Sequence, residues 1–207
     1  GLAANTYSVT VTDSNGCTLI LSDVIGESMA LPLAEDFELG TLPAGWSVAN
    51  NPSSVGWLFG TNLSGAFWTI PTHTGYSASN DDAAGPSNDA SMDYLITPLL
   101  DLSGYTAITL TFDAYFQASY GEVATVEVST NGGTTWTVVE TISDNINWQE
   151  DLTVDLTAYT NDPNSCNILV AFHYNDNGAF ANGLAIDNVN IEGITQGDDY
   201  AAMAQAV

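Results

Sequence analysis

The sequence of 207 residues contains no lysine and no arginine, although it has 25 acidic residues, so its formal charge is −25 with both histidines neutral. An average chain of this length would carry roughly 20 or more basic residues. The acidic content is ordinary, so the charge reflects missing cations and not an excess of anions. Such a surface repels the phosphates of nucleic acids and anionic lipids, and it attracts divalent cations and basic proteins. We therefore expect no nucleic acid partner and no membrane insertion.

The missing cations also remove every internal salt bridge to lysine or arginine. A buried carboxylate in this chain must instead be protonated, hydrogen bonded or bound to a metal ion. Proteases that cleave beside lysine or arginine find no site in the sequence. That property suits a protein exposed outside the cell, and we expect an extracellular or cell-surface location.

Cysteine is scarce, since only Cys17 and Cys166 are present, and no cluster of cysteine and histidine indicates zinc. In an extracellular protein these two cysteines could form one disulfide, and two free thiols are the alternative. No stretch of the sequence is long and apolar enough to span a membrane.

What the sequence does contain is a succession of short strands. Apolar residues make up 45% of the chain and aromatic residues 10%, which is enough for a substantial core. TYSVTVT and CTLILSD, joined by DSNG, predict a hairpin over 6–23. Seven further apolar or alternating runs follow: 93–102, 107–116, 122–130, 134–143, 147–156, 166–174 and 183–193. This pattern predicts an all-β fold, an antiparallel two-sheet β-sandwich of jelly-roll type with an additional N-terminal β-hairpin.

The strand pattern divides the chain into three parts. Residues 1–25 are expected to form the hairpin, 30–193 the jelly roll, and 194–207 a C-terminal tail. Within the jelly roll, 61–92 is rich in glycine, serine, asparagine and aspartate and only weakly periodic. We expect this section to fold over the surface as a functional or metal-pinned loop.

Several motifs occur in an order that resembles a known family. They are EDFELGTLPAGW, GWLFGT, ASNDD, DYLITPLLDL, LTFDAYF, VEVSTNGGTTW and GLAIDNVNI. From about Leu33 to Gly193 this order resembles the cleaved-adhesin domains found beside bacterial surface proteases, which are similar in turn to animal MAM modules. The N-terminal TYSVTVTDSNGCT is similar to the closing hairpin of repeats in bacterial gliding adhesins.

The resemblance implies a non-catalytic jelly roll stabilised by calcium. The positions that match its ligands are Glu35, Glu38, Asn80, Asp81 and Asp187. Calcium takes six to eight oxygen ligands, and acids without internal counter-charges could supply them. The alternative is that both glutamates lie on a solvated strand face and Asp81 caps a turn.

Aromatic residues suggest a second kind of site. Phe67, Trp68 and Tyr76 lie in the long weakly periodic section, where exposed rings could stack on a glycan. The alternative is that such rings belong to the core. No enzyme is expected, because His73 and His173 have no companion serine or cysteine in a nucleophile motif. The histidine in AFHY is expected to be packed and hydrogen bonded.

The sequence therefore favours a structural or adhesin protein without catalysis. An isolated hairpin is marginally stable in water, so 1–25 could add strands to a neighbouring copy and build a fibre. Docking of the hairpin on its own jelly roll, stapled by Cys17 and Cys166, is the alternative. Expected partners are copies of the chain, other surface proteins and glycans. The alternative function is a calcium-dependent carbohydrate-binding module.

Overall fold

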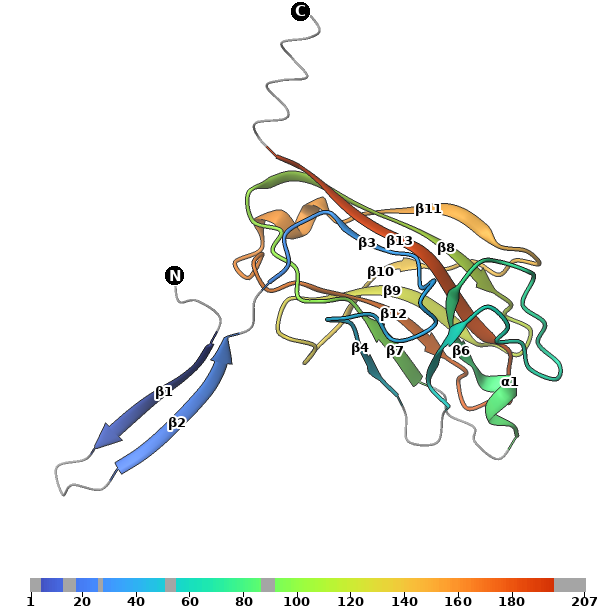
Figure 1. Cartoon of the computed structure of the whole chain (residues 1–207), viewed down its shortest axis with the longest axis horizontal. Coiled ribbons are helices and arrows are strands. Elements are labelled where there is room, and N and C mark those ends of the chain that lie inside the picture. The colour runs from blue at the N-terminus through green and yellow to red at the C-terminus, as the bar shows by residue number, and fades with distance from the viewer. Residues whose placement is uncertain (1–4, 13–17, 26–27, 51–54, 87–91, 196–207) are drawn as a thin grey trace, which may run out of the picture.

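The computed structural model describes residues 5–12, 18–25, 28–50, 55–86 and 92–195, and Figure 1 shows two facing sheets with a separate hairpin. The five-stranded sheet has the order β10 (Thr137–Thr141), β9 (Val123–Ser129), β12 (Leu169–Asn175), β7 (Met92–Ile96), β4 (Ser47–Ala49). The six-stranded sheet has the order β11 (Gln149–Asp155), β8 (Tyr105–Phe116), β13 (Gly183–Thr195), β6 (Tyr76–Asn80), β5 (Trp57–Gly60), with β3 (Leu33–Glu35) also paired to β13. All these ladders are antiparallel, which confirms the predicted all-β sandwich.

The core lies between the two sheets and follows the two-residue period of the strands. On β8, Ile108, Leu110 and Phe112 are buried, and they face apolar side chains of the other sheet. Phe112 meets Phe172 of β12 edge to face, with ring centroids 5.0 Å apart. Alternating apolar residues from both sheets thus close one core.

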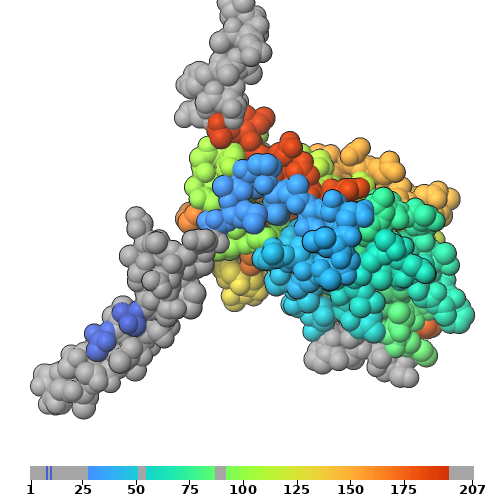
Figure 2. All heavy atoms as spheres, in the orientation of Figure 1, coloured from blue at the N-terminus to red at the C-terminus, as the bar shows by residue number. Residues whose placement is uncertain are grey.

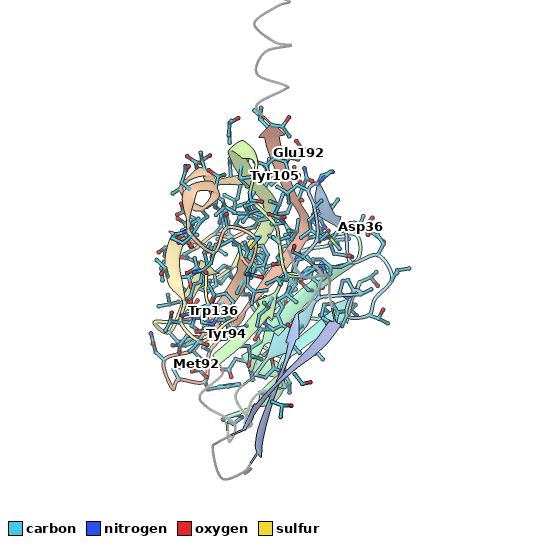
Figure 3. All side chains as sticks on the ribbon, turned by 90° about the vertical axis from the view of Figure 1, so that its left-hand side faces the viewer. Asp36, Met92, Tyr94, Tyr105, Trp136 and Glu192 are labelled. Atoms are coloured by element: carbon cyan, nitrogen blue, oxygen red, sulfur yellow. The ribbon has the colours of Figure 1, made fainter. Side chains whose placement is uncertain are left out.

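A stack of rings covers part of the outer face of the five-stranded sheet. Tyr94 lies parallel to His173, with centroids 3.9 Å apart, and its ring also stacks on Trp136 at 5.5 Å. Figure 3 shows Tyr94 and Trp136 side by side. His173 Nδ1 lies 2.7 Å from Glu127 Oε1. The expectation of a packed, hydrogen-bonded histidine is confirmed.

The predicted hairpin is confirmed as β1 (Asn5–Thr12) paired with β2 (Thr18–Ile25). Within the described residues these two strands form a sheet of their own and pair with no strand of the sandwich. The predicted turn at 13–17 and most of the predicted tail, 196–207, lie outside the described residues.

The expectation of a surface loop over 61–92 is wrong at its centre. β6 lies inside the six-stranded sheet between β13 and β5, and all five of its residues are buried. Its polar side chains are satisfied there, because Ser77 Oγ donates to the carbonyl of Ile186 and Ser79 Oγ donates to Asp93 Oδ2 at 2.7 Å. Figure 2 shows 28–50 and 55–86 together covering the front of the sandwich.

A short helix, α1 (Asp81–Ala84), follows β6 directly, and a 3₁₀ helix spans Thr157–Asn161. Asn80 accepts a hydrogen bond from the amide of Ala83 and so caps α1. No helix in the described part of the chain is both long and apolar enough to cross a membrane.

Candidate functional site

A pocket of about 250 Å³ opens at the end of the sandwich that carries α1, which Figure 1 shows away from the C-terminus. It draws residues from the segment before β6, from α1, from the β8–β9 turn and from the β12–β13 turn. The loop-end pocket is lined by Phe67, Asp82, Tyr120, Phe180, Ala181 and Asn182. Such convergence of loops on a rigid sandwich is where binding residues are usually found.

Aromatic rings form the rim of the loop-end pocket. The side chain of Phe67 is 81% exposed and that of Tyr120 is 62% exposed, although both are large and partly apolar. Phe67 and Phe180 stand at right angles, with ring centroids 6.3 Å apart. The rings of Phe67 and Tyr120 are therefore available to a ligand and are not buried in the core.

A single carboxylate lies at the base of the rim. Asp82 is only 6% exposed, and its Oδ2 accepts the backbone N–H groups of Phe67 at 2.6 Å and Trp68 at 2.9 Å. Its Oδ1 is buried and has no hydrogen-bond partner among the described residues. Gly65 packs so closely that a Cβ there would lie 2.0 Å from Asp82 Oδ2. The carboxylate is thus fixed in place by its surroundings, with one oxygen left over.

Two further buried carboxylates hold the backbone of the pocket. Glu122 accepts the N–H of Tyr120 at 2.6 Å and that of Asn182 at 3.3 Å. Asp81 accepts the N–H of Ala181 at 2.6 Å. Three of the lining residues therefore depend on acidic side chains behind them for their position.

The acidic character continues inward around Tyr174. This side chain is fully buried, and its hydroxyl has no hydrogen-bond partner among the described residues. Burial, and then the nearby carboxylates, hold the pKa of Tyr174 above its ordinary value. These carboxylates, which we call the inner acidic cluster, belong to Asp81, Asp93, Glu122 and Asp176. The cluster and the loop-end pocket share one end of the sandwich.

A second polar group surrounds His73. Its Nδ1 lies 2.8 Å from Asp187 Oδ2, and its Nε2 lies 3.7 Å from Asp113 Oδ2. The ring packs against Trp148, with centroids 4.2 Å apart. Burial raises the pKa of Asp187 to about 6, although hydrogen bonds and the histidine oppose that shift. In a chain without lysine or arginine, this histidine is the one basic side chain placed between two buried acids.

The predicted calcium ligands are divided between the surroundings of His73 and the end of the sandwich that carries the inner acidic cluster. Glu38 and Asp187 both meet the segment before β6, because Glu38 Oε1 accepts the N–H of Gly75 at 2.9 Å and Asp187 accepts from Thr74. A Cβ at Gly75 would lie 2.7 Å from the Cα of Glu38, so the two backbones are in close contact. Burial raises the pKa of Glu35, whose Oε1 accepts the N–H of Phe37.

Asn80 and Asp81 lie at the other end of β6. Asn80 pairs with Gly183 of β13, and Asp187 is four residues further along the same strand. That spacing is roughly 13 Å, whereas ligands of one calcium ion all lie within about 2.6 Å of it. The five residues therefore do not form one site. The described residues contain no group of three or more histidine, cysteine, aspartate or glutamate side chains placed to share a metal ion.

Two of the three predicted glycan contacts belong to a second buried hydrophobic cluster, separate from the core between the sheets, which corrects that expectation. Trp68 is fully buried and stacks on Tyr115, with centroids 5.6 Å apart and an interplanar angle of 7°. Tyr76 is 1% exposed, and its hydroxyl accepts the N–H of Leu63. Only Phe67 of the three presents its ring to solvent.

Cys166 is exposed and is bonded to no other cysteine among the described residues, and its Sγ lies 3.4 Å from Asn167 Nδ2. Its predicted partner, Cys17, lies outside the described residues. The disulfide between them stays a prediction.

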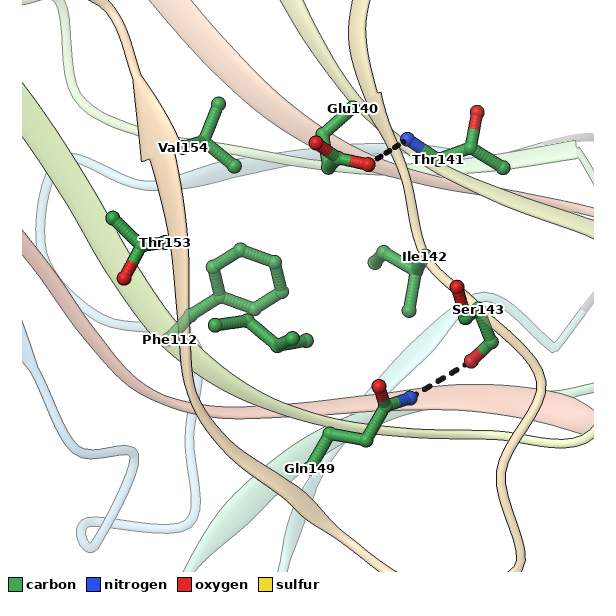
Figure 4. A pocket seen from close by; sticks show the side chains of 9 residues that line it. Phe112, Glu140, Thr141, Ile142, Ser143, Gln149, Thr153 and Val154 are labelled. Atoms are coloured by element: carbon green, nitrogen blue, oxygen red, sulfur yellow. Dashed lines mark hydrogen bonds between the residues drawn. The ribbon is translucent and has the colours of Figure 1, made fainter.

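A second hollow, of about 230 Å³, lies between the edge strands β10 and β11 (Figure 4). Gln149 Nε2 donates to the carbonyl of Ser143 across this gap at 2.8 Å. The lining residues are Phe112, Glu140, Thr141, Ile142, Ser143, Gln149, Leu152, Thr153 and Val154. The two sheets are thus open to solvent along this side.

Sequence reasoning missed most of the loop-end pocket. Asp82, Tyr120, Phe180 and Asn182 lie in three segments that are far apart along the chain. The available signal was that Tyr120 and Phe180 are large aromatic residues in the connections between predicted strands, where small polar residues are usual.

No model of a known protein family matches the chain, and no curated protein matches it. Among solved structures, the K1 cleaved adhesin domain of Lys-gingipain from Porphyromonas gingivalis W83 is 24% identical, with a TM-score of 0.56 over 78% of this chain and 98% of that domain. The K3 domain of the same protein is also 24% identical, with a TM-score of 0.55 over 77% of this chain and 97% of that domain. A Stig cyclase from Fischerella sp. TAU is 17% identical, with a TM-score of 0.50 over 80% of this chain and 99% of that chain. The similarity that the sequence motifs indicate is confirmed at the level of structure: the chain has the fold of the cleaved adhesin domains of Lys-gingipain.

Proposed function

We propose that this chain is a non-catalytic adhesin module of a secreted or cell-surface protein, and that the loop-end pocket is its ligand site. The observation that carries the proposal is the exposed aromatic rim around the buried carboxylate of Asp82. Exposed apolar groups that gather into one patch, as these rings do around the pocket, mark interaction sites, whereas singly scattered ones do not.

Capture by immobilised extracellular proteins and glycans tests this proposal. Some of these immobilised proteins or glycans should retain the unaltered protein. On those surfaces, Phe67→Ala and Tyr120→Ala should be retained less. Ile194→Ala is the matched control, because Ile194 is an exposed apolar residue at the far end of β13 from the pocket. If both rim variants are retained as well as the unaltered protein, the loop-end pocket is not the adhesive site.

Calcium stabilisation is part of the same proposal. The inner acidic cluster supports it, because four carboxylates surround Tyr174 in a chain with no lysine or arginine to neutralise them. Oxygen-rich clusters of this kind suit calcium. Around His73, by contrast, the imidazole already supplies a positive partner for Asp187 when protonated. Because no three acidic side chains in the described part of the chain are placed to share one ion, we propose that fewer of these carboxylates, together with backbone oxygens, hold calcium at the inner acidic cluster, in preference to the five residues that the sequence indicates.

Assembly into a fibre is a second proposal, supported by the hairpin. β1 and β2 make a two-stranded sheet of their own, and both edges of such a sheet can accept another strand. The hollow between edge strands β10 and β11 offers a neighbouring hairpin an open side of the sandwich. We expect the unaltered chain to form polymers visible by electron microscopy, and deletion of 1–25 should abolish them. Polymers that persist after the deletion would contradict strand addition.

Carbohydrate binding is the alternative ligand chemistry, and Phe67 is the predicted contact that remains available for it. A sugar ring could stack on that exposed aromatic face.

A further inference from the structure

We infer that the loop-end pocket binds a single cationic side chain, the ammonium of a lysine or the guanidinium of an arginine, presented by a different protein. This inference rests on the proposed function, since it names the ligand of the same pocket. The juxtaposition that supports it is an aromatic rim above a buried carboxylate that has an unused oxygen.

The rim has the geometry of a partial aromatic cage. Phe67 and Phe180 form two walls at 90° to each other, and the exposed ring of Tyr120 supplies a third. A cation within about 6 Å of such faces is attracted by the negative potential of each ring. The long methylene stem of lysine or arginine gains further from packing on the same rings.

The base of the pocket supplies the counter-charge. Asp82 Oδ1 has no hydrogen-bond partner among the described residues, while Oδ2 is held by two backbone N–H groups. A buried acceptor left unpaired is unfavourable, so this carboxylate favours a positive charge placed close to it. Asp82 lines the pocket, and its Oδ1 is buried behind the pocket wall, so its negative charge attracts an entering ammonium or guanidinium at close range.

Charges behind the pocket favour a cation over a neutral ligand. The buried carboxylates of Glu122 and Asp81 hold the backbone of Tyr120, Asn182 and Ala181. Because no lysine or arginine exists anywhere in the chain, nothing of permanent positive charge offsets them. Their combined potential extends into a concave, partly desolvated space, where it attracts positive charge strongly. A neutral sugar could use the rings but would leave that potential unbalanced.

The absence of lysine and arginine from this chain also indicates where the ligand comes from. A second copy of this chain has no lysine or arginine to insert, so copies cannot fill one another's pockets in this way. The occupant must therefore come from a polypeptide other than this chain, one with an exposed basic residue. Binding of a basic side chain at this pocket is thus a different contact from any assembly of this chain with copies of itself.

Calorimetric titration of the full chain with short peptides tests the inference. The probes are an uncharged peptide carrying one central lysine, the same peptide with arginine, and the same peptide with Nε-acetyl-lysine. We expect the acetylated peptide to bind about tenfold more weakly or not at all, because acetylation removes the charge and the cation–π attraction. The titrations are run with and without calcium, so that an effect of the metal on the pocket is visible.

Three variants locate the binding. Phe67→Ala and Tyr120→Ala remove walls without changing the charge, and each should weaken lysine-peptide binding by about 3- to 30-fold. Asp82→Asn keeps an oxygen for the two backbone N–H groups and removes the charge. Its control is Glu192→Gln, which makes the same charge change near the far end of β13, where Figure 3 labels Glu192. Asp82→Asn should weaken binding at least tenfold more than Glu192→Gln.

Four outcomes overturn the inference. The first two are equal affinity for the lysine and the acetyl-lysine peptide, and equal losses of lysine-peptide affinity in Asp82→Asn and Glu192→Gln. The other two are unchanged lysine-peptide affinity in both rim variants, and measurable affinity for neutral saccharides without affinity for the lysine peptide. Should Asp82→Asn fail to fold, the exposed Phe67→Ala and Tyr120→Ala variants still decide the matter. If capture still depends on Phe67 while no basic peptide binds, the adhesin proposal stands and only this ligand assignment fails.

Discussion

At the scale of single residues, two neighbouring aromatic side chains have opposite roles. Trp68 is fully buried against Tyr115, whereas Phe67 is 81% exposed at the pocket rim. The difference arises because both backbone N–H groups are tied to Asp82 Oδ2, which fixes the turn and directs consecutive side chains apart. Composition alone cannot assign such a pair, since either ring could be the buried one.

Alanine substitution of these two neighbours should give very different stabilities. Trp68→Ala leaves a cavity beside Tyr115 and should lower the free energy of unfolding by about 3–5 kcal/mol. Phe67→Ala removes an exposed ring and should change it by less than about 0.5 kcal/mol. Urea unfolding of both variants measures the difference, and similar losses would contradict the burial described for Trp68.

The pKa of Asp187 predicts a pH dependence of stability. Burial raises this pKa to about 6 in the folded state, compared with an ordinary 3.8. A carboxyl that holds its proton more tightly when folded contributes its full stability below the unfolded pKa, and this contribution is lost as the pH rises through the folded pKa. In chelator, the unaltered protein should therefore lose stability relative to Asp187→Asn between pH 3.8 and 6.

Urea midpoints measured across that pH range decide the point. The Glu150→Gln variant makes the same charge change at an exposed residue. Its urea midpoint should change with pH in parallel with that of the unaltered protein. A difference in urea midpoint between Asp187→Asn and the unaltered protein that stays constant across this pH range would show that Asp187 does not titrate within it.

At the scale of elements, the strands with clear alternation were predictable and the central polar strand was not. All seven runs after residue 92 correspond to β7 through β13. β6 was missed because its YSASN sequence resembles a loop, and its burial depends on partners such as Ile186 and Asp93 that only the fold supplies. Hydrogen bonds to distant residues thus allowed a polar segment to become a central strand.

The candidate site was less predictable than the fold for a related reason. Glu38 and Asp187 do come together through the segment before β6, as motif order suggests. The loop-end pocket instead combines Phe67, Tyr120 and Phe180 from three connections whose relative positions no local pattern encodes. Sequence periodicity reports which face of a strand is buried, but it carries no information on how separate turns meet at the end of a sandwich.

The hairpin should contribute little to the stability of the sandwich. β1 and β2 pair only with each other among the described strands, so deletion of 1–25 should leave the Tm within about 2 °C of that of the full chain, a shift worth less than 1 kcal/mol. Differential scanning calorimetry of both chains provides the comparison. A large fall in Tm would instead support docking of the hairpin on its own sandwich, and a fall in the Tm of the undeleted chain on reduction would implicate Cys17 and Cys166.

At the scale of the whole molecule, electrostatics is dominated by uncompensated carboxylates. The charge of −25 with no lysine or arginine disfavours the compact state, and mobile ions in solution must supply the screening that internal cations normally provide. Several acids are nevertheless buried at one end, behind the loop-end pocket. Adhesion to a basic partner and stabilisation by a divalent ion would both relieve the same accumulation of negative charge.

Calcium and simple screening can be separated by comparing CaCl₂ with NaCl at equal ionic strength. Screening alone raises the Tm equally in both salts, because it depends only on ionic strength. A calcium site should add roughly 5–10 °C at a concentration about 100 times the Kd, through preferential binding to the folded state. Asp81→Asn should abolish that increment while Asp187→Asn preserves it, since we place the ion at the inner acidic cluster around Tyr174. Superimposable melting curves in the two salts would show that the buried carboxylates are stabilised without a bound metal.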